Sequence, residues 1–149
     1  MVNVLERRLV LRMLAYWSDL KGERDFPTPA EIDKKDIGED WRFCALVALD
    51  HDLPRSRLLT VGNDLAPAEA PLPDRLGEIP PGTLLAAAVE RLDWMLLRRV
   101  PLSLGGQLDR ADGPFLYRKI LLPLSQDGVE IDHVLVVANG RPLAVDAAS

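Results

Sequence analysis

Catalytic and cofactor-binding residue types are scarce in this 149-residue chain. It contains one cysteine, Cys44, and two histidines, His51 and His133. A single cysteine excludes an internal disulfide and leaves one candidate thiol. The chain also lacks a glycine-rich phosphate-binding loop and any apolar run near the roughly 20 residues that cross a membrane. Nucleotide binding through such a loop and insertion into a membrane as a helix are therefore excluded.

Basic residues are in the minority, with 18 lysines and arginines against 23 aspartates and glutamates. The formal net charge of −5 and the pI near 5.0 argue against a nucleic-acid-binding surface, which needs excess positive charge. The first residues carry Glu6, Arg7 and Arg8 within an apolar pattern, which does not resemble a secretory signal peptide. We therefore expect a cytoplasmic protein.

The composition that remains is typical of one soluble globular domain with a sizeable core, at 48% hydrophobic and 28% charged residues. Its clearest structural signal is the segment from Phe115 to Asn139. Two apolar runs flank Ser125-Gln126-Asp127-Gly128, and Asp-Gly between such runs predicts a β-hairpin. The second run, Ile131 to Ala138, is apolar on both faces apart from Asp132 and His133. This pattern predicts a central strand that is covered on both faces.

The earlier segments predict the covers and the remaining strands. Apolar residues at helical spacing indicate an N-terminal helix and a long internal helix, and alternating residues indicate three further strands. Five prolines interrupt the region between the second of these strands and the internal helix. Gly105-Gly106 predicts a bend or bulge in the strand that follows that helix. In chain order the elements are a helix at Val4 to Leu20, strands at Trp41 to Asp50 and Arg57 to Gly62, a proline-broken loop at Asn63 to Pro81, a helix at Thr83 to Val100, and a strand at Leu102 to Leu108.

This order indicates an α+β fold whose helices are segregated by face. We expect residues 1–22 to form an amphipathic helix used for packing or dimerisation, residues 23–143 to form the core, and residues 144–149 to fray. The apolar stripe of the first helix is wider than the roughly 100° that one sheet face needs. A homodimer interface is therefore expected at Leu5, Leu9, Met13 and Trp17.

Two motifs resemble a known family. LRMLAYWSDLKGERDFPTPAEID places a Tyr-Trp helix before a proline-flanked segment, and RKILLPLSQDGVEIDHVL forms the Leu-Pro-Leu-Ser…Asp-Gly hairpin. Both resemble the small, stand-alone PAS-like proteins found in alphaproteobacteria. The resemblance implies a PAS-like five-stranded antiparallel sheet of order 2-1-5-4-3, with a long internal helix on one face. The proline-broken loop departs from the short helices that cover the ligand in PAS domains.

Cofactors familiar in PAS domains are not expected. A haem needs an axial ligand, usually a histidine of the long helix, and Thr83 to Val100 contains none. Flavin photosensors of this class carry their cysteine on a helix in an Asn-Cys-Arg-Phe-type motif, whereas Cys44 falls in a predicted strand. An inert core thiol fits Cys44 better. Trp94, near the polar arc of the helix, fits either a partly exposed core residue or a ligand contact.

The histidines support little catalytic chemistry. Neighbouring residues of a strand point to opposite faces, so Asp132 and His133 are not expected to pair. Asp50-His51-Asp52 could contribute to a metal site, but nothing nearby completes a ligand set, and a solvated turn is the simpler interpretation.

The predicted function is a non-catalytic PAS-like sensory or protein-interaction module, which acts in signalling through a partner. A small apolar ligand is compatible with this function but not required by it. The alternative is a small α+β enzyme of the curved-cone type that uses His133 with Asp109 or Asp132. A third class, a purely structural dimerisation domain, differs from the first in whether an internal cavity exists.

Overall fold

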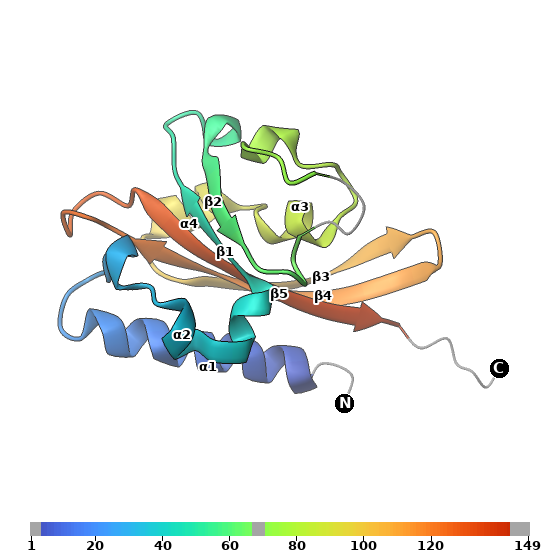
Figure 1. Cartoon of the computed structure of the whole chain (residues 1–149), viewed down its shortest axis with the longest axis horizontal. Helices are drawn as coiled ribbons and strands as arrows, with labels where there is room; N and C mark the ends of the chain where they lie inside the picture. The colour runs from blue at the N-terminus through green and yellow to red at the C-terminus, as the bar shows by residue number, and fades with distance from the viewer. Residues whose placement is uncertain (1–3, 67–70, 144–149) are drawn as a thin grey trace.

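The computed structural model describes residues 4–66 and 71–143. Five strands form one antiparallel sheet of order β2-β1-β5-β4-β3, so the predicted α+β class and strand order are confirmed (Figure 1). The strands are β1 (Cys44–Ala48), β2 (Arg57–Val61), β3 (Leu102–Arg110), β4 (Gly113–Leu124) and β5 (His133–Pro142). The α-helices are α1 (Val4–Lys21), α2 (Lys34–Ile37), α3 (Leu84–Ala88) and α4 (Leu92–Arg98). Short 3-10 helices lie at η1 (Pro29–Glu31), η2 (Gly38–Phe43), η3 (Leu53–Arg55) and η4 (Leu76–Glu78).

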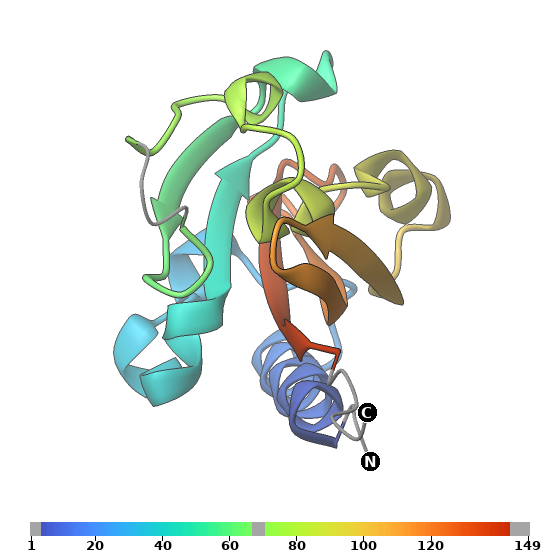
Figure 2. The same ribbon diagram turned by 90° about the vertical axis from the view of Figure 1, so that its right-hand side faces the viewer.

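The sheet is covered on both faces, by α1 on one side and by α3 and α4 on the other (Figure 2). Strand β5 pairs with β1 on one edge and with β4 on the other. Its residues from Val134 to Ala138 are fully buried, which confirms the central strand predicted from the two-sided apolar run. None of the helices in the described ranges is long and apolar enough to cross a membrane.

Strand β1 begins at Cys44, not near Trp41 as predicted. The residues before it form η2, and their backbone passes directly over Gly62. A Cβ on Gly62 would lie 2.1 Å from the carbonyl oxygen of Trp41, so only glycine permits this approach. Trp41 and Phe43 therefore pack on the α1 side, whereas Ala45 and Val47 face α3 and α4. The alternation that predicted one strand from Trp41 to Asp50 therefore does not correspond to one strand face.

Helix α1 packs its apolar side against the sheet of its own chain. Leu9, Met13 and Trp17 retain 1%, 2% and 5% of their exposure, because they pack against β4 and β5. These residues were expected to meet a second chain, and their burial removes them from any such interface. The side chain of Leu5 lies outside the described residues. Gly22, with φ of +57°, follows the last residue of the helix and ends it.

The long internal helix predicted from Thr83 to Val100 is two short helices, α3 and α4. Thr83 caps α3, since its Oγ1 accepts a 3.1 Å hydrogen bond from the amide of Ala86. The break follows from a buried lysine on β4. Lys119 Nζ donates to the carbonyl oxygen of Ala87 at 2.9 Å and also to that of Glu90. Arg91 then adopts a left-handed conformation, with φ of 70°, and α4 starts in a new direction.

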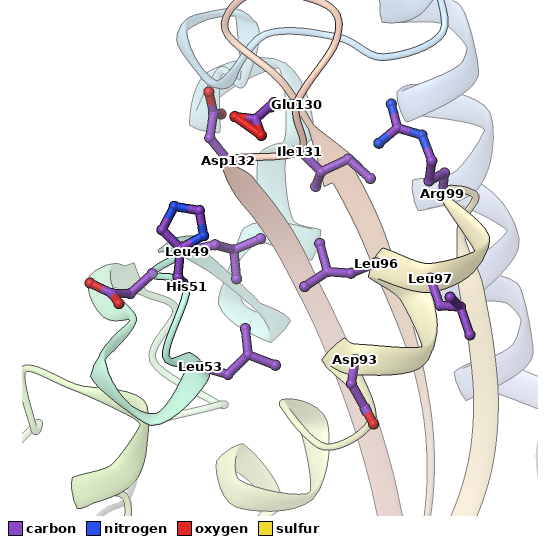
Figure 3. A pocket seen from close by; sticks show the side chains of 11 residues that line it. Leu49, His51, Leu53, Asp93, Leu96, Leu97, Arg99, Glu130, Ile131 and Asp132 are labelled. Atoms are coloured by element: carbon purple, nitrogen blue, oxygen red, sulfur yellow. The ribbon is translucent and has the colours of Figure 1, made fainter.

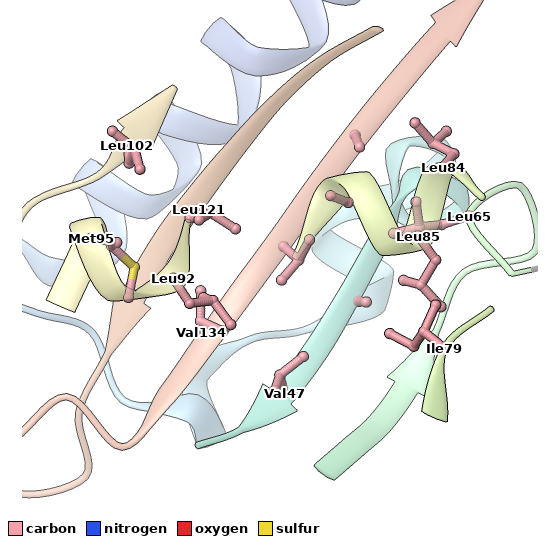
Figure 4. Close-up of a cluster of buried hydrophobic side chains, with 14 of the residues drawn as sticks. Val47, Leu65, Ile79, Leu84, Leu85, Leu92, Met95, Leu102, Leu121 and Val134 are labelled. Carbon is pink, nitrogen blue, oxygen red and sulfur yellow. The ribbon is translucent and has the colours of Figure 1, made fainter. Parts of the chain in front are cut away.

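The space between the sheet and these two helices is filled by apolar side chains (Figure 4). Leu85 of α3 and Met95 of α4 are fully buried there, against Leu121 of β4. The proline-broken loop supplies Leu65 and Ile79 to the same cluster. This part of the loop is thus a piece of the core, and residues 67–70 lie outside the described ranges.

Strand β3 keeps a continuous register with β4 from Leu102 to Arg110, so of the bend or bulge predicted at Gly105-Gly106 the bulge is absent. Gly106 serves a different purpose. The ring of Tyr117 on β4 lies across it, and a Cβ at this position would be 2.5 Å from the Tyr117 hydroxyl oxygen. The missing side chain leaves room for the tyrosine on the same face of the sheet.

Candidate functional site

A cleft of about 680 Å³ lies where three connections meet at one end of the sheet (Figure 3). We call it the His51 cleft. One wall is the β1–β2 connection, the second is α4 with Arg99, the residue that follows it, and the third is the β4–β5 connection. The lining residues are Leu49, Asp50, His51, Leu53, Asp93, Leu96, Leu97, Arg99, Glu130, Ile131 and Asp132.

Hydrogen bonds hold the three walls together. The amide of Leu49 donates to the carbonyl oxygen of Asp132 at 2.9 Å, which joins the first wall to the third. The guanidinium of Arg99 donates to the carbonyl oxygen of Val129, which joins α4 to the third wall. Because each bond spans two separate segments, the cleft is a preformed feature of the fold.

The β4–β5 connection is shaped by Asp127. Its Oδ1 accepts hydrogen bonds from the amides of Val129 and Glu130 at 2.8 and 2.9 Å, and from Ser125 Oγ at 3.0 Å. These donors stabilise the carboxylate, so they lower the pKa of Asp127 below its ordinary value. The Asp-Gly signal in the sequence therefore marks the residue that places Glu130 on the rim of the cleft.

The floor of the cleft is apolar and its rim is acidic. Leu49, Leu53, Leu96 and Ile131 are half-buried against the core, and Leu97 stands beside them with 83% of its surface exposed. Four carboxylates line the cleft against one arginine. Asp93 lies near one end of the view in Figure 3, and Glu130 and Asp132 lie near the other.

Two of the four carboxylates accept hydrogen bonds from the backbone, and the other two, those of Asp93 and Glu130, do not. Asp50 accepts from the amide of Asp52 at 2.9 Å, and Asp132 accepts from the amide of Gln126. Asp93 and Glu130 are exposed and form no ion pair or side-chain hydrogen bond with the rest of the described chain. Their charges are therefore free to meet a ligand.

His133 and Asp132 form a pair, contrary to the prediction from strand alternation. His133 Nδ1 lies 2.8 Å from Asp132 Oδ1, and the imidazole retains 13% exposure. The reason is that β5 starts at His133, so Asp132 belongs to the connection and is free to turn back. The other proposed acid, Asp109, pairs with Pro114 at the far end of β4, whereas His133 pairs with Leu124. Ten residues of strand, about 33 Å, separate those positions.

The remaining candidate residues lie apart from a reaction centre. His51 is exposed on the cleft rim, and no group of three potential metal ligands is found in the described ranges. Cys44 is fully buried on the α1 side of the sheet, its thiol donates to the carbonyl oxygen of Asp40, and burial raises the pKa of that thiol. Trp94 is 42% exposed and stacks against Arg91, 4.6 Å from ring centroid to guanidinium carbon.

A second cleft, of about 1030 Å³, lies at the opposite end of the sheet and includes Arg110 and Phe115. Its polar groups mostly serve the fold. Asp64 forms an ion pair of 2.6 Å with Arg42, and Asn139 Oδ1 accepts from the amide of Gly140. The His51 cleft, with its unpaired carboxylates, is therefore the better candidate for binding.

Sequence patterns alone did not single out the His51 cleft. Asp132 and His51 were noticed for other chemistry, but Leu97 and Glu130 were missed, because each is ordinary within its own segment. The one signal in the sequence was Leu97, an apolar residue on the polar side of the predicted internal helix. No known protein family matches the chain, and no characterised protein shows significant sequence similarity to it.

Proposed function

We propose that this protein is a non-catalytic, PAS-like interaction module that acts in signalling by binding a partner protein at the His51 cleft. The strand order of the sheet and its two covering layers support the PAS-like assignment. The observation that carries the binding site is the exposed Leu97, at 83%, beside an apolar floor and two carboxylates that have no side-chain partner within the described residues. Exposed apolar surface that continues into the apolar floor of a preformed cleft is typical of a recognition surface.

The charge of the cleft defines the partner. Four carboxylates and one arginine line it, and that arginine already donates to Val129. The complementary ligand is a short basic segment that places an apolar side chain on Leu96 and Leu97 and a lysine or arginine near Asp93 and Glu130. Apolar contact then supplies the affinity, and charge supplies selection and orientation.

A cofactor in the interior is not needed for this function. In the PAS-like arrangement an internal ligand would sit between the sheet and the helices, where Leu85, Met95 and Leu121 already pack in full burial. The small apolar ligand considered from the sequence would have to displace these side chains. We therefore place recognition on the surface of the protein.

Fluorescence anisotropy with three labelled peptides tests the proposal. The first has leucines between terminal lysines, the second replaces the lysines by glutamates, and the third replaces the leucines by alanines. Only the first is expected to bind appreciably at low ionic strength. The double variant Asp93→Asn, Glu130→Gln should bind it roughly fivefold more weakly, since two exposed charge pairs contribute about 0.5 kcal/mol each.

The matched control is Asp19→Asn with Asp36→Asn, which removes the same charge from exposed positions near the α1 side. If this control weakened binding as much as the cleft variant, attraction to net charge would explain the data and the docking site would be wrong. Equal binding of the lysine and glutamate peptides, or no binding of any peptide, would also overturn it.

An enzyme using His133 is the second candidate, because Asp132 orients the imidazole at 2.8 Å. A nucleophilic mechanism also needs a serine, threonine or cysteine within reach of that base. His133 itself does not line the His51 cleft, and none of these nucleophiles is among the residues that do. Hydrolysis of p-nitrophenyl acetate that is lost in His133→Gln, with the fold retained, would favour the enzyme over the interaction module.

A further inference from the structure

The two edges of the sheet differ in how their backbone is covered. Beyond β2, the amide of Leu58 donates to the carbonyl oxygen of Asp74, and the amide of Leu76 donates to that of Ser56, both at 2.9 Å. An isolated bridge pairs Arg57 with Arg75 between these bonds. A returning segment of the chain thus occupies the β2 edge.

The β3 edge has no such cover in the described chain. Leu102–Arg110 pairs with β4 alone, and no other backbone hydrogen bond to these residues is formed within residues 4–66 and 71–143. Nine residues make this a long strand for a free edge. An exposed edge of this kind is a template for another strand.

The register identifies the backbone groups that point outward. Arg110 pairs with Gly113 across a two-residue turn, and the residues that flank such a turn exchange both of their hydrogen bonds. The even-numbered residues from Leu102 to Arg110 therefore bond to β4. Ser103, Gly105, Gln107 and Asp109 direct their amides and carbonyls away from the sheet, and all four residues are exposed.

The usual protection against edge pairing is missing from this strand. It contains no proline and no lysine, and its register with β4 shows no bulge. Its charged residues, Asp109 and Arg110, sit together at one end and cancel. Within a chain of net charge −5, this edge carries no repulsive charge along most of its length.

We propose that β3 pairs antiparallel with β3 of a second copy, about a two-fold axis at Gly106, to form a continuous ten-stranded sheet. The outward residues then meet one another: Ser103 faces Asp109 of the second copy, and Gly105 faces Gln107 of the second copy. Each of these pairs exchanges two backbone hydrogen bonds. On the face that α3 and α4 cover, half-buried Leu104 packs against Leu108 of the second copy.

The side chains select this register. With the axis at Gly106 all nine residues of β3 are paired, and no two like charges are opposed. Moving the axis towards Asp109 shortens the paired length and finally sets two Asp109 carboxylates against each other. Leu102 meets Arg110 of the second copy, whose guanidinium carbon lies 3.7 Å from the centroid of the Phe115 ring.

This interface lies away from α1, where Leu9, Met13 and Trp17 are buried against the sheet. It is independent of the His51 cleft, which is formed by other segments. Dimerisation would therefore leave peptide binding at the cleft unaffected.

Sedimentation velocity tests the proposal with a matched pair of variants at one position. Gln107→Pro removes an outward amide and no bond to β4, and its ring blocks the second strand. Gln107→Ala removes the same side chain and keeps the amide. At high micromolar concentration we expect a dimer for the natural chain and for Gln107→Ala, and a monomer with an unchanged circular dichroism spectrum for Gln107→Pro.

Amide hydrogen exchange locates the interface. The amides of Ser103, Gly105, Gln107 and Asp109 should become protected as concentration rises, whereas the neighbouring even-numbered amides are protected at all concentrations. If Gln107→Pro fails to fold, Gly105→Lys places a charge on the edge where a Cβ meets nothing closer than 3.4 Å. A monomeric natural chain, a folded Gln107→Pro or Gly105→Lys dimer, or fast exchange of the four amides in the dimer would overturn the proposal.

Discussion

The indole Nε1 of Trp17 donates a hydrogen bond of 2.8 Å to the carbonyl oxygen of Pro123. Trp17 lies in the last turns of α1, and Pro123 lies near the end of β4, opposite Val134 of β5. Both the indole and the carbonyl are shielded from water, so the bond fixes where the helix crosses the sheet.

Replacing Trp17 with phenylalanine should keep much of the apolar contact and remove this donor. The buried carbonyl of Pro123 would be left unsatisfied, which costs about 1–3 kcal/mol of unfolding free energy. Urea denaturation measures the loss. Leu11→Ala is the control, because Leu11 lies on the same helix with 59% exposure and should change stability by less than about 0.5 kcal/mol.

Met13→Lys distinguishes a buried α1 from an α1 that binds a second chain. Met13 is 2% exposed, so a lysine there places a charge within the core and should cost about 3 kcal/mol or more. We expect a largely unfolded protein by circular dichroism. A stable, folded monomer would instead restore the interface at Leu9 and Met13 that the sequence suggested.

Gly62→Ala should destabilise the protein by about 3 kcal/mol, because the new Cβ would overlap the backbone of Trp41 and Arg42. Backbone atoms have little freedom to move aside, so η2 must shift or unfold. Gly105→Ala is the control, with its nearest neighbour at 3.4 Å. Thermal unfolding of both variants decides the matter, and equal melting temperatures would contradict the packing of η2 over Gly62.

Lys119 predicts a pH dependence. Burial lowers its pKa from 10.5 to about 8, and the nearby Glu90 carboxylate offsets part of that effect. Between about pH 8 and pH 10.5 the unfolded chain therefore binds more protons at this site than the folded chain. Stability contributed by this site rises with pH across that window, and it is constant below pH 8.

The measurement is the difference in unfolding free energy between the natural chain and Lys119→Met at each pH. This difference cancels Cys44, whose raised pKa makes its own contribution fall as the solution becomes alkaline. We expect the natural chain to gain stability relative to the variant from pH 8 upward. A difference that is flat or falls with pH would contradict the lowered pKa of Lys119.

Purified protein is expected to carry neither haem nor flavin. The segment from Thr83 to Val100 offers no histidine for an axial ligand, and the Cys44 thiol faces α1. A visible absorption spectrum of gently purified protein checks this. A Soret or flavin band that stays with the protein through gel filtration would refute the expectation.

The parts of the fold that sequence patterns predicted are those set by local apolarity. Ile131 to Ala138 reads as a central strand because both of its faces are apolar, and the structure covers both. The break between α3 and α4 was not visible, because its cause, Lys119, lies on a strand that is remote in sequence. Likewise Trp41 and Phe43 alternate as a strand would, but the contact with Gly62 bends their backbone into η2.

The candidate site was harder to predict than the fold. The His51 cleft is made of three connections, and each is unremarkable alone. The Asp132–His133 pair was missed because its geometry depends on where β5 begins, a boundary that apolar patterning locates only to within a few residues.

The position of β5 between β1 and β4 also controls when the sheet can be completed during synthesis. Cys44 pairs with Val137, so the first strand waits for the last one before it gains its second neighbour. Contacts so distant along the chain slow folding, because a long loop must close first. When β1 through β4 have left the ribosome and β5 has not, the nascent chain therefore contains two separate hairpins, β1–β2 and β3–β4. Their inner edges are apolar and unpaired. Until β5 emerges, these exposed edges favour aggregation or binding to a chaperone.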